Sequence, residues 1–395
     1  MNIILFDDQK RGDFLPFTYT RPLADIRIGV LTIAEKWNAV FNTTSSFVTQ
    51  DYLSTKFEAI YSEDNTYING RLIPSLRIIK KIKSLNEGES LVYNDTLLAI
   101  RSNTILSLDA FNSFDKSKSI TYDAIPFILE SITDIFSKND DAISQDFRLL
   151  TEGRTSQELN SNTLFIGDKN NLFIEEGATV NATSINTLEG FIYIGKNAEI
   201  MEGSCIRGSL ALCESSTIKM GAKIYGATTI GPHSKVGGEV NNSVIFGFSN
   251  KGHDGFLGNS VIGEWCNLGA DTNNSNLKNN YAEVRLWNYS SGRFAHTGLT
   301  FCGLILGDHS KSAINSMFNT GTVVGVSANI FGSGFPKNFI PSFSWGGNQE
   351  YALKKVLEVA KIVYSRRKKE LEDVDIDILT HVFEETKVYR EKWLR

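Results

Sequence analysis

The residue best suited to proton transfer in this chain is His253, which stands in the segment Lys251-Gly-His-Asp-Gly255. Imidazole titrates near neutral pH, so it can take up or release a proton under physiological conditions. Gly252 and Gly255 would let the backbone approach a ligand closely. The alternative is a loop histidine that is hydrogen-bonded to a carbonyl group. The two glycines and the surrounding segment favour a role in catalysis.

Other residues with possible chemistry are spread more widely. Lys10, Arg11 and Arg21 supply positive charge of the kind that could hold a triphosphate. A Gly-rich phosphate-binding loop is missing, because Gly12 is the only glycine in this region. His296 has no cysteine or carboxylate at a metal-ligand spacing. The same is true of His309, so we expect structural roles for both histidines.

Composition restricts the kinds of partner. The chain has 395 residues, of which 41% are hydrophobic and 22% charged, and its formal net charge is -5. This describes a globular protein with no overall attraction for nucleic acid or anionic lipid. The four cysteines form no CxxC pair, which fits a reducing compartment. The apolar run from Ile3 to Phe6 is too short for a signal peptide or a membrane span. We therefore expect a cytoplasmic protein with small-molecule substrates.

A period of six residues organises the middle of the chain. An aliphatic residue occupies every sixth position, and a small residue usually stands two places before it; the aliphatic residues are Ile194, Ile200, Ile206, Leu212, Ile218, Ile224, Ile230 and Val236. Neither a helix nor an ordinary sheet strand has this period. It predicts a left-handed parallel β-helix of hexapeptide repeats, in which the aliphatic side chains point inward.

The period is interrupted twice. It returns at Phe256, Ile262 and Leu268, and it breaks again at a polar excursion over residues 271–298. After this excursion it resumes at Leu306, Ser312, Phe318, Val324 and Ile330. We expect loops to leave the β-helix at both breaks, with His253 on the first.

The two ends of the chain differ from the repeat. The N-terminal pattern predicts mixed α/β structure, with strands at Ile3–Phe6 and Ser90–Tyr93 and helices at Gly29–Trp37 and Asp123–Phe136. Two amphipathic stretches, Glu350–Glu372 and Asp375–Trp393, predict C-terminal helices that cover the end of the solenoid. The basic run Arg366-Arg-Lys-Lys369 is interpreted as a solvated helix face.

Residues 251–278 resemble a known site. His253 is followed by Leu257-Gly-Asn-Ser-Val-Ile-Gly263, by Asn267-Leu-Gly-Ala270 and by Asn276-Leu277. This order resembles the acetyltransferase site of the bifunctional sugar-1-phosphate nucleotidylyltransferase/acetyltransferases, which include the bacterial N-acetylglucosamine-1-phosphate uridylyltransferase/glucosamine-1-phosphate acetyltransferase. With the repeat, the resemblance covers residues 165–345. The opening, residues 3–29, is similar to the nucleotidyltransferase-like domain of a divergent Bacteroidetes branch of this family.

The resemblance implies three parts. These are a shortened, Rossmann-like α/β nucleotidyltransferase-like domain over residues 1–155, a left-handed β-helix acyltransferase domain over 160–345 and a C-terminal helical cap over 346–395. It also implies an acetyl-CoA-dependent N-acetyltransferase acting on an amino-sugar 1-phosphate, most simply glucosamine-1-phosphate. A nucleotidylyltransferase activity that forms UDP-N-acetylglucosamine would be a second function.

The resemblance also assigns roles in acetyl transfer. His253 falls on the general base that takes a proton from the sugar amine. Asn267 and Asn276 fall on polar contacts to the acceptor, although asparagine also occupies β-helix corners with positive φ. Backbone N–H groups of Leu268, Gly269 and Ala270 would serve the thioester carbonyl and the pantetheine arm.

Two positions differ from the bacterial pattern. Phe256 stands in place of a tyrosine, and Asn241 in place of a lysine of the substrate-phosphate site. Arg285 roughly matches a basic residue of the archaeal relatives and would supply the missing charge.

In the N-terminal part, Asp95 follows an apolar strand as the family's Mg²⁺-binding aspartate does, and Arg11 and Arg21 would contact the nucleotide. An ordinary turn residue is the slightly favoured alternative for Asp95. We expect a homotrimer, with residues 271–298 reaching across to a neighbouring β-helix. A β-helix scaffold with decayed sites and a regulatory role is the alternative to an enzyme.

Overall fold

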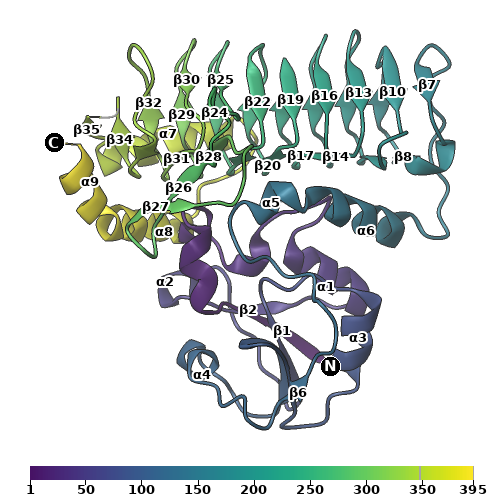
Figure 1. Ribbon diagram of the computed structural model, residues 1–395, viewed down its shortest axis with the longest axis vertical. Helices are drawn as coiled ribbons and strands as arrows, with labels where there is room; N and C mark the ends of the chain where they lie inside the picture. The colour runs from purple at the N-terminus through teal and green to yellow at the C-terminus, as the bar shows by residue number, and fades with distance from the viewer. Residues whose placement is uncertain (347, 395) are drawn as a thin grey trace.

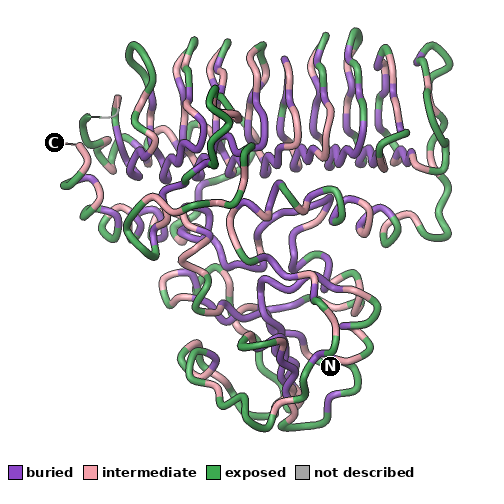
Figure 2. The backbone as a smooth tube through the Cα atoms, in the orientation of Figure 1, coloured by how far each residue is buried: buried purple, intermediate pink, exposed green. Residues whose placement is uncertain are grey.

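The computed structural model describes residues 1–346 and 348–394. An N-terminal α/β part lies beside a long solenoid, and C-terminal helices lie in the angle between the two (Figure 1). Buried residues follow the interior of the solenoid, the N-terminal sheet and the junction between them (Figure 2). Among the described residues, no helix is long and apolar enough to cross a membrane.

The N-terminal sheet has six strands in the order β2-β1-β3-β5-β4-β6. Its strands are β1 Asn2–Phe6, β2 Ser46–Val48, β3 Asn65–Asn69, β4 Ser90–Tyr93, β5 Thr96–Ser102 and β6 Ile120–Thr121. β1 pairs in parallel with β2 and β3, as in a Rossmann-like sheet, whereas β5 is antiparallel to β3 and β4. The α-helices of this part are α1 Ile33–Phe41, α2 Asp51–Ser54, α3 Leu76–Lys83, α4 Leu108–Asn112, α5 Asp134–Ser137 and α6 Asn139–Thr151.

Two predicted helices need correction. α1 begins at Ile33 and not at Gly29, because Thr32 and Glu35 form a capping box at its start. The predicted helix 123–136 does not form as a unit, and only α5 at its end is helical. Pro126 disfavours a helical conformation in the residue before it. Ile128 instead makes an antiparallel bridge to Leu72.

The solenoid has three faces built from parallel strands, except that the last strand of face 3 is antiparallel to its neighbour. Face 1 contains β7 Leu164–Ile166, β10 Ser184–Asn186, β13 Cys205–Arg207, β16 Lys223–Tyr225, β19 Glu239–Asn241 and β22 Phe256–Gly258. Face 2 contains β8 Leu172–Ile174, β11 Ile192–Ile194, β14 Leu210–Leu212, β17 Thr228–Ile230, β20 Val244–Ile245, β23 Val261–Ile262, β28 Leu304–Leu306, β31 Thr322–Val324 and β33 Phe339–Ile340. Face 3 contains β9 Thr179–Val180, β12 Glu199–Ile200, β15 Thr217–Ile218, β18 Lys235–Val236, β21 Asn250–Lys251, β24 Asn267–Leu268, β29 Lys311–Ser312, β32 Asn329–Ile330, β34 Ser344–Trp345 and β35 Gln349–Glu350.

The interior of the solenoid confirms the period of six. All eight aliphatic residues from Ile194 to Val236 are at most 1% exposed. One predicted interior residue is wrong, because Leu257 pairs with Val240 and is buried, whereas the neighbouring Phe256 is only half-buried. The reason is a shorter corner: the interior residues Leu257 and Ile262 are five residues apart, so a count of six back from Ile262 selects Phe256.

The polar excursion folds back onto its own chain. It contains β25 Asn273–Asn274, which pairs with β30 Met317–Phe318, and a hairpin of β26 Arg285–Asn288 with β27 Arg293–His296. The Asn288 amide donates to Asp13 of the N-terminal part at 3.0 Å. Trp287 stacks on Phe339 of the last turns, with ring centroids 4.3 Å apart. The hairpin therefore joins parts of one chain, contrary to the expectation that it extends to a neighbour.

The C-terminal helices are α7 Leu353–Ser365, α8 Asp373–Glu385 and α9 Lys387–Trp393. These helices contact the side of the solenoid and the N-terminal part as well as the end of the solenoid. In α7, Tyr364 stacks on Trp265 of the solenoid at 3.9 Å between ring centroids. In α8, Asp375 accepts from Lys56 of the N-terminal part at 2.7 Å. The helices therefore connect the solenoid to the N-terminal part.

Candidate functional site

His253 lies on a loop, residues 252–255, that joins β21 on face 3 to β22 on face 1, and it is exposed. Gly255 has φ of +116°, and a Cβ atom there would lie 2.2 Å from the Thr272 carbonyl oxygen. One turn away, a Cβ atom on Gly238 would lie 2.9 Å from the His253 carbonyl oxygen. Glycine is therefore required for the loop to pack this closely between its neighbouring turns.

A buried lysine holds the same loop from inside the solenoid. Lys251 pairs with Val236 in the interior column and is only 3% exposed. Its ammonium group donates to the His253 carbonyl oxygen at 2.6 Å. Burial lowers the pKa of Lys251 to about 8, although the carboxylates of Asp254 and Asp271 oppose this shift. Sequence reasoning missed this residue, and the available signal was a lysine six places after Ile245 in a column of aliphatic residues.

The two predicted asparagines are strand or loop residues with specific partners. Asn250 donates to the side-chain oxygen of Asn267 at 2.9 Å, and Asn276 donates to that of Asn259 at 2.7 Å. Positive φ occurs at Asn259 but not at Asn267 or Asn276. The corner role that we considered as an alternative therefore does not apply to these two residues.

Phe256 and Asn276 lie together on face 1, next to the His253 loop. A Cβ atom on Gly258 would be 2.6 Å from the Phe256 ring and 2.7 Å from the Asn276 amide nitrogen, so both side chains lie over this glycine. Asn241 is the partner of Gly258 on the adjacent strand. Arg285 is exposed on β26, and no hydrogen bond or ion pair joins it to these residues in the described part of the chain.

The turn Leu268-Gly-Ala270 is part of the solenoid ladder. The Gly269 N–H donates to the Ser312 carbonyl oxygen at 3.1 Å. A Cβ atom on Gly269 would lie 2.4 Å from the carbonyl carbon of Ala313, so the two backbones are in close contact. The Gly269 N–H is therefore already used within the solenoid, and the role of this turn in binding the cofactor stays a prediction.

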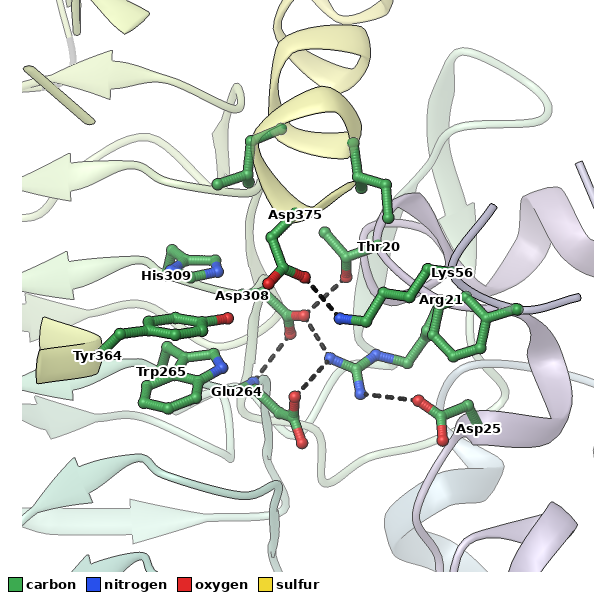
Figure 3. A pocket seen from close by; sticks show the side chains of 13 residues that line it. Thr20, Arg21, Asp25, Lys56, Glu264, Trp265, Asp308, His309, Tyr364 and Asp375 are labelled. Carbon is green, nitrogen blue, oxygen red and sulfur yellow. Dashed lines mark hydrogen bonds and ion pairs between the residues drawn. The ribbon is translucent and has the colours of Figure 1, made fainter. Parts of the chain in front are cut away.

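Arg21 is buried at the junction of the three parts, where Figure 3 shows the side chains around a small cavity. It pairs with Asp308 of the solenoid, and also with Glu264 and Asp25 at 3.4 Å each. Thr20 donates to the same Asp308 at 2.6 Å. Burial raises the pKa of Asp25 to about 6, although the Arg21 guanidinium opposes the shift. Arg21 thus joins two parts of the fold and is not open to a nucleotide.

The other predicted nucleotide ligands also have local roles. Arg11 donates to the Tyr52 hydroxyl at 2.7 Å and pairs with Asp7 at 3.4 Å. Asp95 is exposed in the tight turn between β4 and β5, after Asn94 with φ of +49°. No group of three metal-ligating side chains occurs among residues 1–346 and 348–394. Asp95 therefore lies in a turn, and its role as a metal ligand stays a prediction.

The carboxyl ends of β1 and β3 lie side by side, where ligands bind in open α/β sheets. Asp8 is the second residue after β1, and it accepts from Arg71 at 2.6 Å and from Asn69 at 2.9 Å. Lys10 and Glu130 form an ion pair at 3.6 Å nearby. Sequence reasoning did not select Asp8, Asn69 or Arg71, although Asp8 belongs to an Asp7-Asp8 pair that follows a buried strand.

Comparisons with known proteins found a matching family model and a similar protein. Residues 3–155 match the model of a family described as sugar nucleotidyl transferase. This part is therefore sugar nucleotidyltransferase-like. A bifunctional sugar-1-phosphate nucleotidylyltransferase/acetyltransferase of Sulfurisphaera tokodaii is 31% identical over 146 residues. The match covers 36% of each chain, so this chain spans about a third of the length of that relative.

Solved structures with similarity to the chain include two sugar acyltransferases. UDP-N-acetylglucosamine acyltransferase from Campylobacter jejuni is 12% identical, with a TM-score of 0.19, and the match covers 57% of this chain and 95% of that chain. A mutant of perosamine N-acetyltransferase from Caulobacter crescentus, in complex with CoA and GDP-perosamine, is 10% identical, with a TM-score of 0.14, over 84% of this chain and 94% of that chain.

Proposed function

We propose that this protein is an acetyl-CoA-dependent N-acetyltransferase that acts on an amino-sugar 1-phosphate, with glucosamine-1-phosphate as the first candidate. The observation that carries the proposal is the loop of His253. It presents an exposed imidazole, and its backbone is held by the buried Lys251 and by the close packing of Gly255. A fixed backbone under an exposed imidazole suits general base catalysis, because geometry must be set before proton transfer.

In the proposed reaction, the sugar amine attacks the carbonyl carbon of the thioester. The new C–N bond forms, the C–S bond breaks, and His253 removes the proton that the nitrogen must lose. The departing thiolate takes up a proton and leaves as the free thiol. Asn276 and Asn267 are proposed to orient the acceptor, because each has a side-chain amide within one or two strands of the loop.

His253→Ala tests this role. We expect kcat with acetyl-CoA and glucosamine-1-phosphate to fall by a factor of about 10² or more, with little change in the affinity for acetyl-CoA, because a base acts on the amine. His296→Ala is the matched control, because His296 is also an exposed histidine but lies on the β26–β27 hairpin. Wild-type turnover in the His253 variant would show that the imidazole is not the base.

A second activity, nucleotidyl transfer, is supported by the family match of residues 3–155. We propose the edge formed by Asp8, Asn69 and Arg71 as its location, with Mg²⁺ held there by a carboxylate. Asp95 stays a second proposal for the metal ligand. Release of pyrophosphate from UTP with N-acetylglucosamine-1-phosphate and Mg²⁺ is the assay, and its absence would leave acetyl transfer as the sole activity.

A homotrimer also remains our proposal, because the His253 loop is open on its outer side and a neighbouring solenoid would close it. The mass in solution, measured by light scattering, tests it. A monomer would count against a shared site. Absence of acetyl transfer with every amino-sugar phosphate tried would favour the alternative of a scaffold with decayed sites.

A further inference from the structure

A cavity of about 440 Å³ lies between the end of α7 and face 3 of the solenoid. Its polar lining contains four basic side chains and two amides, and no carboxylate is present among the described residues that line it; these polar residues are Lys235, Asn250, Asn267, Lys311, Arg366 and Arg367. We interpreted the basic run Arg366-Arg-Lys-Lys369 as a solvated helix face. Its first two residues instead form part of the wall of this cavity.

The solenoid wall of the cavity is built by strict register. Lys235, Asn250, Asn267 and Lys311 are aligned partners on four successive strands, β18, β21, β24 and β29. Their strand neighbours Val236 and Leu268 point into the core, so this column points outward. Strands lie about 4.8 Å apart, which places the two lysine positions roughly 14 Å from one another.

The positive charge in this cavity has no counter-charge from the protein. None of the four cations forms an ion pair within the described residues, in contrast to Arg21, Arg71 and most other buried cations. Lys311 is half-buried, its ammonium group donates to the His309 carbonyl oxygen at 2.8 Å, and burial lowers its pKa. Burial likewise lowers the pKa of Arg367, and the adjacent Arg366 adds to this.

Lys311 and Arg367 are partly buried, whereas Lys235 and Arg366 are exposed. A partly buried cation without an anion raises the free energy of the folded protein. A bound anion would remove this cost. The α7 side offers guanidinium groups, which match phosphate oxygens as planar forks, and the solenoid side offers ammonium groups as point charges. Cations on both walls, with two amides between the lysines, favour an elongated anion with more than one phosphate group over a single small ion.

We propose that this cavity is a binding site for the diphosphate group of a small molecule. Two sources share this chemistry: coenzyme A, and a nucleotide diphosphate such as UDP or its sugar esters. Asn250 directly precedes Lys251 and the His253 loop, so an acyl carrier bound here would have its reactive end near the proposed base. Only the choice of coenzyme A as the source rests on the proposed function. The diphosphate site itself rests on the four basic side chains that line the cavity.

Binding of inorganic pyrophosphate to the intact protein, measured by isothermal titration calorimetry at low salt, tests the site directly. We expect Arg367→Gln to weaken this binding by at least about tenfold. Lys361→Gln is the matched control, because it removes the same charge six residues before Arg367, on the last turns of α7, and Lys361 is exposed and does not line the cavity. It should change binding by less than about twofold. Circular dichroism confirms that each variant is folded.

Competition then separates the two sources. Displacement of pyrophosphate by coenzyme A supports the site and identifies the acyl carrier, and displacement by UDP but not by coenzyme A supports the site and identifies a nucleotide. No binding of pyrophosphate to the wild-type protein, or equal weakening by Arg367→Gln and Lys361→Gln, overturns the inference. Acetyl transfer that depends on His253 but is unchanged in Arg367→Gln would leave the proposed function intact and would exclude coenzyme A as the occupant of this cavity.

Discussion

Lys251 occupies a position in the solenoid interior where an aliphatic side chain is expected. Replacing it with methionine should show how much the buried ammonium group lowers the free energy of unfolding. The folded-state pKa of about 8 lies below the ordinary value of 10.5. Each pKa unit is worth about 1.4 kcal/mol, so the buried ammonium costs about 3 kcal/mol at neutral pH. The charged hydrogen bond to the His253 carbonyl offsets about 1.5–3 kcal/mol of this. Lys251→Met should therefore be as stable as the wild type at pH 7, or more stable by up to about 2 kcal/mol.

The pH dependence is the sharper test. A lysine whose pKa is lower in the folded state loses its proton there first, so wild-type stability rises as pH increases from about 8 toward 10.5. Between pH 7 and pH 10 this gain amounts to about 2.5 kcal/mol, and Lys251→Met should lack it. Urea denaturation of both proteins at the two pH values measures the difference. Val236→Met is the control, because it alters the same column without changing charge.

The same variant separates stability from function. Without the ammonium group, the His253 carbonyl loses its donor, so the loop is held less firmly. We expect kcat for acetyl transfer to fall while the KM for acetyl-CoA stays nearly constant, because Lys251 positions the base and is not in contact with substrate. The reasoning is refuted if the stability difference between wild type and Lys251→Met is the same at pH 7 and pH 10.

Two further substitutions probe the packing around the site. Asp308→Asn removes the charge that pairs with a buried arginine, so it should lower the free energy of unfolding by about 3–5 kcal/mol in urea denaturation, whereas Glu189→Gln in an exposed ion pair should change it by less than about 1 kcal/mol. Gly255→Ala should lower both the melting temperature and kcat, because the new methyl group has no room. Gly332→Ala has a similar φ of +124° but open space around it, so an equal effect there would mean that backbone strain alone is responsible.

The solenoid was predictable because its signal is repeated many times. Each turn places one aliphatic residue inward at each face, so a single irregular position does not hide the period. Prediction failed where the turns shorten, since the sequence pattern selects Phe256 and not the buried Leu257. It also failed at residues 123–136, where the apolar residues suit a helix but Pro126 and the bridge from Ile128 favour an extended chain.

Contacts between distant segments explain most of what was missed at the sites. Arg21 has the charge of a phosphate ligand, but its partner Asp308 lies 287 positions away in the chain. Trp287 and its hairpin have the length to reach another molecule, but the N-terminal part of the same chain offers a nearer partner. Spacing along the chain carries no information about such pairs. The Gly-His-Asp-Gly pattern could be recognised in the sequence, unlike these distant pairs. Its glycine Gly255 is required by close contact with an adjacent turn of the repeat.

The basic run after α7 shows how the two kinds of information combine. On a helix alone, Arg366 and Arg367 suggest solvated charge, because isolated surface cations are common and cost little. On face 3, the pairing of the strands aligns Lys235 with Lys311 in one column, although the turns between them differ in length, so a regular count of six does not reveal this column. Neither the basic run after α7 nor the column on face 3 is unusual by itself. The two sets of residues line one cavity, and no carboxylate occurs among the described residues that line it. This combination distinguishes an anion site from two solvated surfaces.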